Sequence, residues 1–117
     1  MRTANLHRAL RYLLGLGTIG YAVASVTQPR RFAELTDMDE ETIQEMAKRD
    51  VMSGVDILTA ASPTMPLVSR AFYDFGDGLK LLRRRPSIAW VAFAWGLLAI
   101  VALLTRPSEQ ESRAAES

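Results

Sequence analysis

The longest uncharged run of the chain covers residues 87–105 and is apolar around the whole circumference of a helix. It reads SIAWVAFAWGLLAIVALLT, with three arginines at 83–85 before it and Arg106 after it. A hydrocarbon core about 30 Å thick requires roughly 20 apolar residues of helix, so the run is predicted to span a membrane. The alternative is a helix buried on every side in a soluble bundle, which a chain of 117 residues rarely builds.

A second apolar run, residues 12–27, follows a short basic segment at the N-terminus. The basic segment, the apolar run and the small residues at 22–25 also resemble a secretory signal. The length of the run favours a membrane-spanning helix that ends before Pro29. Within it, Gly20 and Ala24 form a pair of small residues four apart, which lets another helix approach closely.

Two further helices are predicted at residues 38–61 and 67–82. In the first of these, apolar side chains recur at helical spacing, and acidic residues in the first turn suit the positive end of the helix dipole. Pro63 and Pro66 separate the two helices, because proline interrupts a helix. The two helices are therefore expected to form a tight hairpin.

These four segments predict an all-α fold, namely a four-helix integral membrane bundle with up-down topology. Residues 1–106 are assigned to this single domain. Residues 107–117 are polar and lack apolar periodicity, so they are predicted to form a disordered tail. Basic residues are concentrated near the loops after the first and third helices, and the positive-inside rule places those loops in the cytoplasm and both termini outside.

Composition narrows the possible functions. The net charge is +1 and there is no basic stripe with interleaved aromatics, so no nucleic-acid partner is expected. The chain has no cysteine, which excludes disulfides and thiolate metal sites. Its single histidine, His7, is expected to be solvated or to lie among lipid headgroups. We predict no metal and no cofactor.

Catalytic motifs are absent from the sequence. It contains no Ser/His/Asp or Cys/His set, no phosphate-binding loop and no HExxH motif. Catalysis by an arginine and aspartates alone is the least favoured reading. We therefore expect that the protein is not an enzyme.

The two middle helices carry charges among their apolar residues. The charged positions are Arg49, Asp50, Asp56, Arg70, Asp74 and Asp77. Arg49 and Asp56 are seven apart, and the last three are spaced i, i+4 and i+7, so each helix presents one charged stripe. Ionisable residues in membrane helices usually face the bundle interior and pair with one another. The sequence thus predicts one polar seam shared by these six residues.

Two readings of the seam remain open. In the structural reading, two arginines and four aspartates pair and fix how the helices pack. In the functional reading, the excess of two negative charges keeps one carboxyl protonated, which is suited to proton transfer or cation binding. Asp74 and Asp77, one turn apart, are the pair most suited to share that proton.

The segments RDVMSG at 49–54 and RAFYDFGD at 70–77 resemble the DoxX-like group of small four-helix membrane proteins, and the resemblance covers residues 11–105. It implies a four-helix integral membrane fold, in a bacterial inner membrane. Named members of the group are linked to respiratory quinol oxidation and to membrane-associated thiol stress complexes, usually as partners of other proteins. A direct thiol role conflicts with the absence of cysteine.

The resemblance implies an accessory or assembly role in a membrane complex, possible partners being the lipid bilayer, other membrane subunits or further copies of the chain. Only the motif positions are carried over, without catalytic roles: Arg49, Asp50, Arg70, Asp74 and Asp77. The alternative function is a stand-alone, oligomeric carrier of protons or small solutes.

Overall fold

The computed structural model describes residues 2–107, which form five α-helices and no strand. The helices are α1 (Arg2–Thr27), α2 (Pro29–Thr36), α3 (Glu40–Thr59), α4 (Thr64–Leu81) and α5 (Pro86–Leu104). The prediction of an all-α fold is confirmed for this part of the chain. The predicted polar tail lies, apart from Pro107, outside the described residues.

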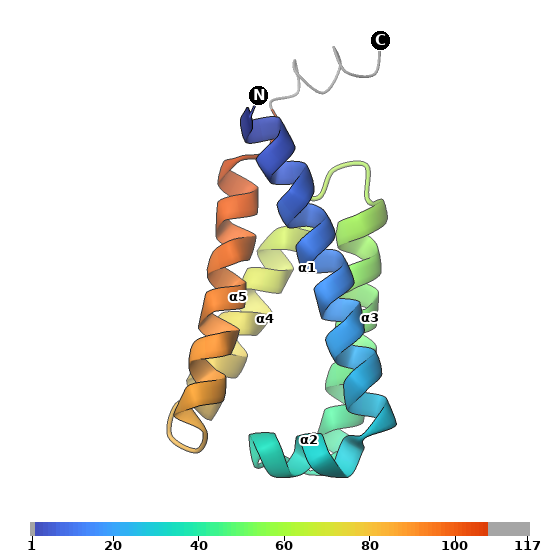
Figure 1. The fold of residues 1–117 in the computed structure, drawn as a ribbon, viewed down its shortest axis with the longest axis vertical. Helices are drawn as coiled ribbons and strands as arrows, with labels where there is room; N and C mark the ends of the chain where they lie inside the picture. The colour runs from blue at the N-terminus through green and yellow to red at the C-terminus, as the bar shows by residue number, and fades with distance from the viewer. Residues whose placement is uncertain (1, 108–117) are drawn as a thin grey trace.

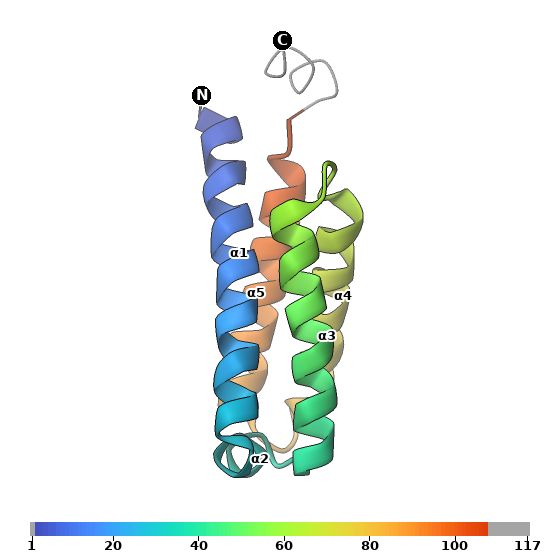
Figure 2. The same cartoon turned by 90° about the vertical axis from the view of Figure 1, so that its right-hand side faces the viewer.

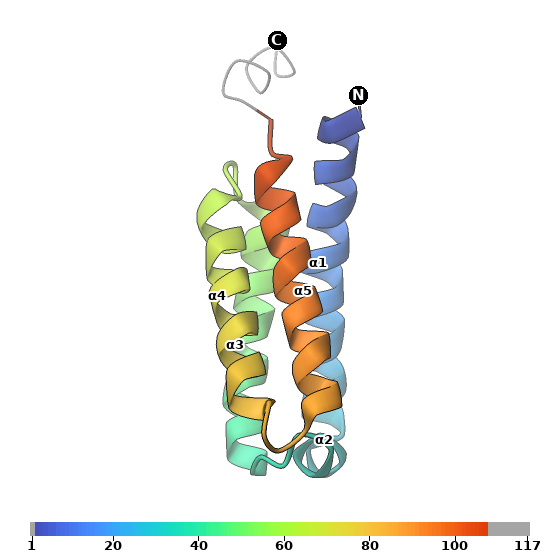
Figure 3. The same cartoon turned by 90° about the vertical axis from the view of Figure 1, so that its left-hand side faces the viewer.

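The four long helices run up and down, and the short α2 lies across one end of them (Figure 1, Figure 2). Packing is closest within two pairs: α1 lies along α3, and α4 lies along α5 (Figure 3). The contact between α3 and α4 is much smaller. The two middle helices are joined by a short connection, as expected, but they do not pack closely along their length as a tight hairpin would. The two helix pairs diverge toward the end where α2 lies (Figure 1).

The fifth helix, α2, is the main departure from the predicted element order. Pro29 ends α1 at Thr27, as expected, but it also occupies the first turn of α2. Proline is favourable there because its missing N–H would have no helical acceptor. Asp37 then ends α2 in the left-handed conformation, with φ of 58°. Asp39 begins the next helix, since its side chain accepts a 2.7 Å hydrogen bond from the Thr42 N–H.

Two helices begin earlier than the sequence indicated. The first starts at Arg2 rather than at residue 12, so the basic lead is itself helical. The fourth starts at Thr64 and includes Pro66. Because Pro66 lies in the first helical turn, its lack of an N–H costs no hydrogen bond.

Two glycines allow α1 and α3 to meet backbone to backbone. A Cβ on Gly54 would lie 2.8 Å from the Gly15 carbonyl oxygen and 2.5 Å from the Ile19 side chain, and one on Gly15 would lie 3.1 Å from the Gly54 oxygen. Gly20, where the sequence suggested close approach, has no such neighbour within 4 Å. No helix among the described residues approaches Gly20, which is exposed.

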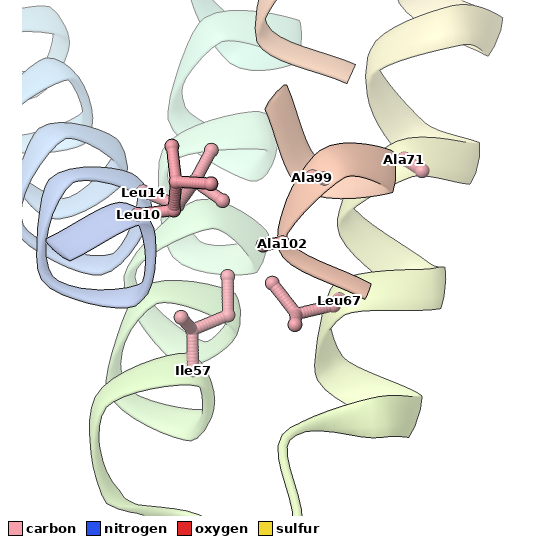
Figure 4. Close-up of a cluster of buried hydrophobic side chains, with 7 residues drawn as sticks. All are labelled: Leu10, Leu14, Ile57, Leu67, Ala71, Ala99 and Ala102. Atoms are coloured by element: carbon pink, nitrogen blue, oxygen red, sulfur yellow. The ribbon is translucent and has the colours of Figure 1, made fainter. Parts of the chain in front are cut away.

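The apolar core fills the half of the bundle away from α2. Figure 4 shows its side chains gathered between the long helices. The core consists of Leu10, Leu14, Ile57, Leu67, Ala71, Ala99 and Ala102. Its members come from all four long helices, and Leu14, Ile57 and Leu67 are fully buried. This half of the molecule therefore holds the two helix pairs together.

Two polar residues of α1 join it to α5 and to the end of α3 by hydrogen bonds at the core half of the bundle. His7 is buried, and its Nδ1 donates to the Ala102 carbonyl at 2.7 Å, so the expectation of a solvated histidine was wrong. Arg11 reaches the end of α3, where Nε donates to the Ile57 carbonyl at 2.5 Å and Nη2 donates to the Ala60 carbonyl. Carbonyls at a helix C-terminus lack helical donors, so Arg11 satisfies two of them.

The outer surface of the long helices is rich in large apolar side chains. Two helices, α1 and α5, are long and apolar enough to cross a membrane, by length and composition. Only 22% of the apolar window of α5 is buried. Trp90 and Leu97 on α5 are exposed, as are Phe72 on α4 and Met52 on α3.

Candidate functional site

Five charged side chains of α3 and α4 form one continuous ion-pair network. Arg70 binds both oxygens of Asp74, with Nη2 to Oδ1 at 2.9 Å and Nε to Oδ2 at 3.1 Å. Its Nη1 lies 3.0 Å from Oδ1 of Asp50. The same Oδ1 accepts from Arg49, whose Nη2 is also 2.8 Å from Oδ2 of Asp77. Charges of opposite sign thus alternate from Asp77 to Asp74.

The network is held in place by helical spacing and by burial. Arg70 and Asp74 are four residues apart on α4, so they share one face of that helix. Arg70 is only 2% exposed, and Asp50 opposes it from α3. No buried side-chain nitrogen or oxygen within residues 2–107 lacks a hydrogen-bond partner. The buried Arg70 is tolerated because its charge is paired with carboxylates and each of its three nitrogens donates to one of them.

Asp56 does not belong to this network, contrary to the sequence prediction. It is exposed, and it forms no ion pair with any described residue. Its helical position relative to Arg49 was judged correctly, but the two side chains differ in length. The arginine extends from α3 to Asp77, whereas the short aspartate stays at the helix surface.

Without Asp56 the charge balance of the network changes. Three carboxylates face two guanidinium groups, which leaves one excess negative charge rather than two. Asp74 and Asp77, proposed as a proton-sharing pair, each bind a different arginine. Their spacing along α4 therefore serves two separate ion pairs.

Two members of the site were missed from the sequence. The ring of Tyr73 lies under both guanidinium groups, with its centroid 4.5 Å from Cζ of Arg49 and 5.6 Å from Cζ of Arg70. Such cation–π contacts stabilise the charged form of arginine. Ser53 places its Oγ 3.5 Å from Arg70 Nη1. The available signal was spacing, since Tyr73 follows Arg70 by three residues and Ser53 follows Asp50 by three.

A cavity of about 290 Å³ lies beside the network, between the two helix pairs. Every helix contributes to its lining, which consists of Gly17, Thr18, Tyr21, Ser25, Thr36, Met38, Ile43, Met46, Ala47, Asp50, Arg70, Asp74, Asp77, Leu81, Ile88, Val91, Ala92 and Trp95. Most of these side chains are apolar. An apolar cavity with a few convergent polar groups is the usual form of a small-molecule site.

The cavity stops where the apolar core begins, because none of the core residues belongs to its lining. On α1, Leu14 belongs to the core and Thr18 lines the cavity, one turn farther along. Thr18 also accepts a 3.1 Å hydrogen bond from Nε1 of Trp95, which joins α1 to α5. The network thus lies at the boundary between a packed half and a hollow half of the bundle.

The other end of the cavity is covered by α2. Arg84 and Arg85, in the connection between α4 and α5, donate to the carbonyls of Asp37 and Glu34, both at 3.4 Å. Phe32 of α2 packs edge-on against Tyr21, with ring centroids 5.3 Å apart. The two arginine hydrogen bonds are exposed, whereas Thr36 at the end of α2 is buried.

Metal binding has no ready site in this part of the chain. The described residues contain no cluster of three or more histidine, cysteine, aspartate or glutamate side chains that could hold an ion. The site can bind a ligand by ion pairing and hydrogen bonding beside an apolar cavity.

Comparison of the chain with family models, with curated proteins and with solved structures finds no match.

Proposed function

We propose that this chain is an integral membrane protein in which α1, α3, α4 and α5 form a four-helix bundle within the bilayer. We further propose that it acts as an accessory or assembly subunit of a larger complex in a bacterial inner membrane. Membership of the DoxX-like group is part of this proposal. Its support is that the two motif segments, 49–54 and 70–77, meet in a single ion-pair network.

The observation that carries the proposal is the exposure of α5. This helix is apolar throughout, yet only 22% of its apolar window is buried inside the structure. In a water-soluble bundle such a helix would be enclosed. Exposed apolar residues on the other long helices extend the same surface, and extended apolar surfaces mark contact with lipid or with another protein.

The short helix α2 fits the edge of a bilayer. It lies across the end of the bundle and is amphipathic, with Arg30, Arg31 and Glu34 among its polar residues and Phe32 and Leu35 among its apolar ones (Figure 1). Helices of this kind lie in the plane of the membrane interface. Basic residues in the nearby connection, at 83–85, favour a cytoplasmic position for this end.

An accessory role suits the site better than transport by a single copy. None of the core residues lines the cavity, so one chain offers no continuous path through the core to the other end of the bundle. The arginines of the network are engaged in ion pairs within the chain. The apolar outer surface of the helices is available for contact with another membrane protein.

The direct test is affinity purification of the tagged chain from its native membrane in a mild detergent, with the mass of the intact complex measured. A stoichiometric larger partner is expected. Trp90→Ala on α5 and Phe72→Ala on α4 form a matched pair of exposed aromatic truncations, and a selective loss of partner with one of them identifies the docking face. Recovery of the chain alone or as a homo-oligomer would contradict the accessory role.

The second candidate is an oligomeric proton-coupled or small-solute carrier, and the cavity with its charged wall favours it. Asp74 lines the cavity and carries one of the three carboxylates. In a carrier, Asp74→Asn is expected to abolish proton-coupled flux in proteoliposomes while the protein stays folded. An unchanged flux, or none in the wild type, would exclude this function.

A further inference from the structure

We propose that the cavity binds an apolar organic cation, with an ammonium group placed against Asp50 and Asp77 and a hydrocarbon body along the helix walls. The proposal depends on the geometry of the cavity and not on the accessory role. It specifies a ligand class that the ion-pair network alone does not imply.

The first observation is that each of these two carboxylates has an unused oxygen. Both arginines bind Oδ1 of Asp50, and Arg49 binds Oδ2 of Asp77. Within residues 2–107 no donor reaches Oδ2 of Asp50 or Oδ1 of Asp77. Every fully buried side-chain oxygen in these residues has a hydrogen-bond partner. These two oxygens have none, so they are not fully buried and can be reached from accessible space.

Their accessibility is through the cavity. Asp50 is 5% exposed and Asp77 is 9% exposed, so neither side chain lies on the outer surface. Both line the cavity. The two carboxylates therefore present hydrogen-bond acceptors to whatever occupies that space.

The second observation is the sign of the charge around the cavity. The charged residues in its lining are Asp50, Arg70, Asp74 and Asp77, and Arg49 completes the network behind them. Their ordinary charges sum to −1. In a poorly solvated place an excess negative charge attracts a cation strongly and disfavours an anion.

The third observation is the apolar character of the remaining wall. Ile43, Leu81 and Ile88 face the cavity from three helices, and the aromatic rings of Tyr21 and Trp95 also line it. A small inorganic cation would leave this wall in contact with water. A purely apolar molecule would leave the two carboxylate oxygens without donors, which is costly. An ammonium group on a hydrocarbon body satisfies both parts of the wall.

The test is a binding titration on the purified full-length chain in lipid nanodiscs. The probe is 4-phenylbutylamine, which is cationic at neutral pH, and the control ligand is pentylbenzene, which has nearly the same shape and no charge. We expect one site per chain and at least a tenfold preference for the amine. Equal affinity for the two ligands would overturn the proposal.

Variants distinguish the cavity from lipid partitioning. Asp77→Asn removes the excess charge and is expected to reduce amine affinity about tenfold while pentylbenzene binding is unchanged. Asp56→Asn is the matched control, because this aspartate is exposed and outside the network. An equal loss in both variants would show that binding is a surface charge effect and would overturn the proposal.

A cavity-filling variant provides a measurement that leaves the ion pairs intact. Ala92→Phe places a ring into the cavity from α5. It is expected to abolish saturable binding of both ligands, and retained binding would overturn the proposal even if Asp77→Asn did not fold. Because no partner is present in this assay, its outcome is separate from that of the affinity purification.

Discussion

Nη1 of Arg70 lies 3.0 Å from Oδ1 of Asp50, and this ion pair joins α4 to α3 at mid-length. The two helices share little apolar packing, because each lies mainly against another neighbour. Arg49 adds the second link between them, to Asp77 at 2.8 Å. Charged contacts therefore hold the two helix pairs together where the core ends and the cavity begins.

Arg70→Ala is expected to destabilise the protein strongly. The change leaves Asp50 and Asp74 buried without their main cation, and breaking a buried pair from one side costs about 3–5 kcal/mol. The measurement is the free energy of unfolding in detergent. Arg106→Ala serves as the control, because that arginine is exposed and its one hydrogen bond to the described residues 2–107 goes to the Leu103 carbonyl, and its effect should stay within about 0.5 kcal/mol. Equal destabilisation by the two substitutions would contradict a structural role for the network.

Gly54→Ala is expected to push α1 and α3 apart. The added Cβ would lie 2.8 Å from the Gly15 carbonyl oxygen, and that backbone cannot move without shifting the helix. Overpacking of this kind costs about 1–3 kcal/mol. Gly20→Ala is the control, since it meets nothing within 4 Å and gains up to about 1 kcal/mol of helix propensity. Thermal unfolding should move in opposite directions for the two variants, and a shared direction would refute the close crossing.

Arg11→Ala is expected to loosen the end of α3. It removes donors from the Ile57 and Ala60 carbonyls and should cost about 1.5–3 kcal/mol, as for hydrogen bonds from a charged group. Hydrogen exchange should speed up in the last turn of α3. Arg8→Ala, on the exposed side of α1, should leave the exchange in α3 unchanged. Slowed or unaltered exchange in Arg11→Ala would show that these bonds do not stabilise the helix end.

The start of α3 is expected to respond to acid. Hydrogen bonding to the Thr42 hydroxyl and N–H holds the pKa of Asp39 below its usual range. Its stabilisation is therefore complete above the unfolded pKa, near 4, and is lost as the pH falls through the lower folded value. The protection of the Thr42 amide, taken as its exchange rate relative to the intrinsic rate at the same pH, should fall over that interval. In Asp39→Ala the protection of this amide should be low at every pH, with no such step.

Much of the helical architecture could be predicted from the sequence, because long apolar or amphipathic runs leave few alternatives. The helix α2 could not, since Pro29 was read only as a helix end, although proline also suits a helix start. Pro66 led to a late start for α4 for a similar reason. The pairing of the helices was missed as well, because the Gly15–Gly54 contact depends on how two distant segments cross.

Five of the six expected residues belong to the network, and helical spacing placed three of them, Arg70, Asp74 and Asp77, on one face of α4. It failed for Asp56 because side-chain length, and not only angular position, decides which groups meet across a gap. The cavity could not be predicted from spacing along single helices, because residues from all five helices line it. The membrane location, the partner and the ligand stay predictions that the experiments above address.

The separation of the core half from the cavity half implies an uneven distribution of local stability. Amide hydrogens near Leu14 and Ile57 are surrounded by packed side chains, whereas those near Tyr21 and Ile88 border empty space. Regions with few buried contacts open at lower free energy than the rest of a fold. We therefore expect a hinge motion of the two helix pairs. The hinge would lie near the apolar core, and the distance between the pairs would change most at the end where α2 lies.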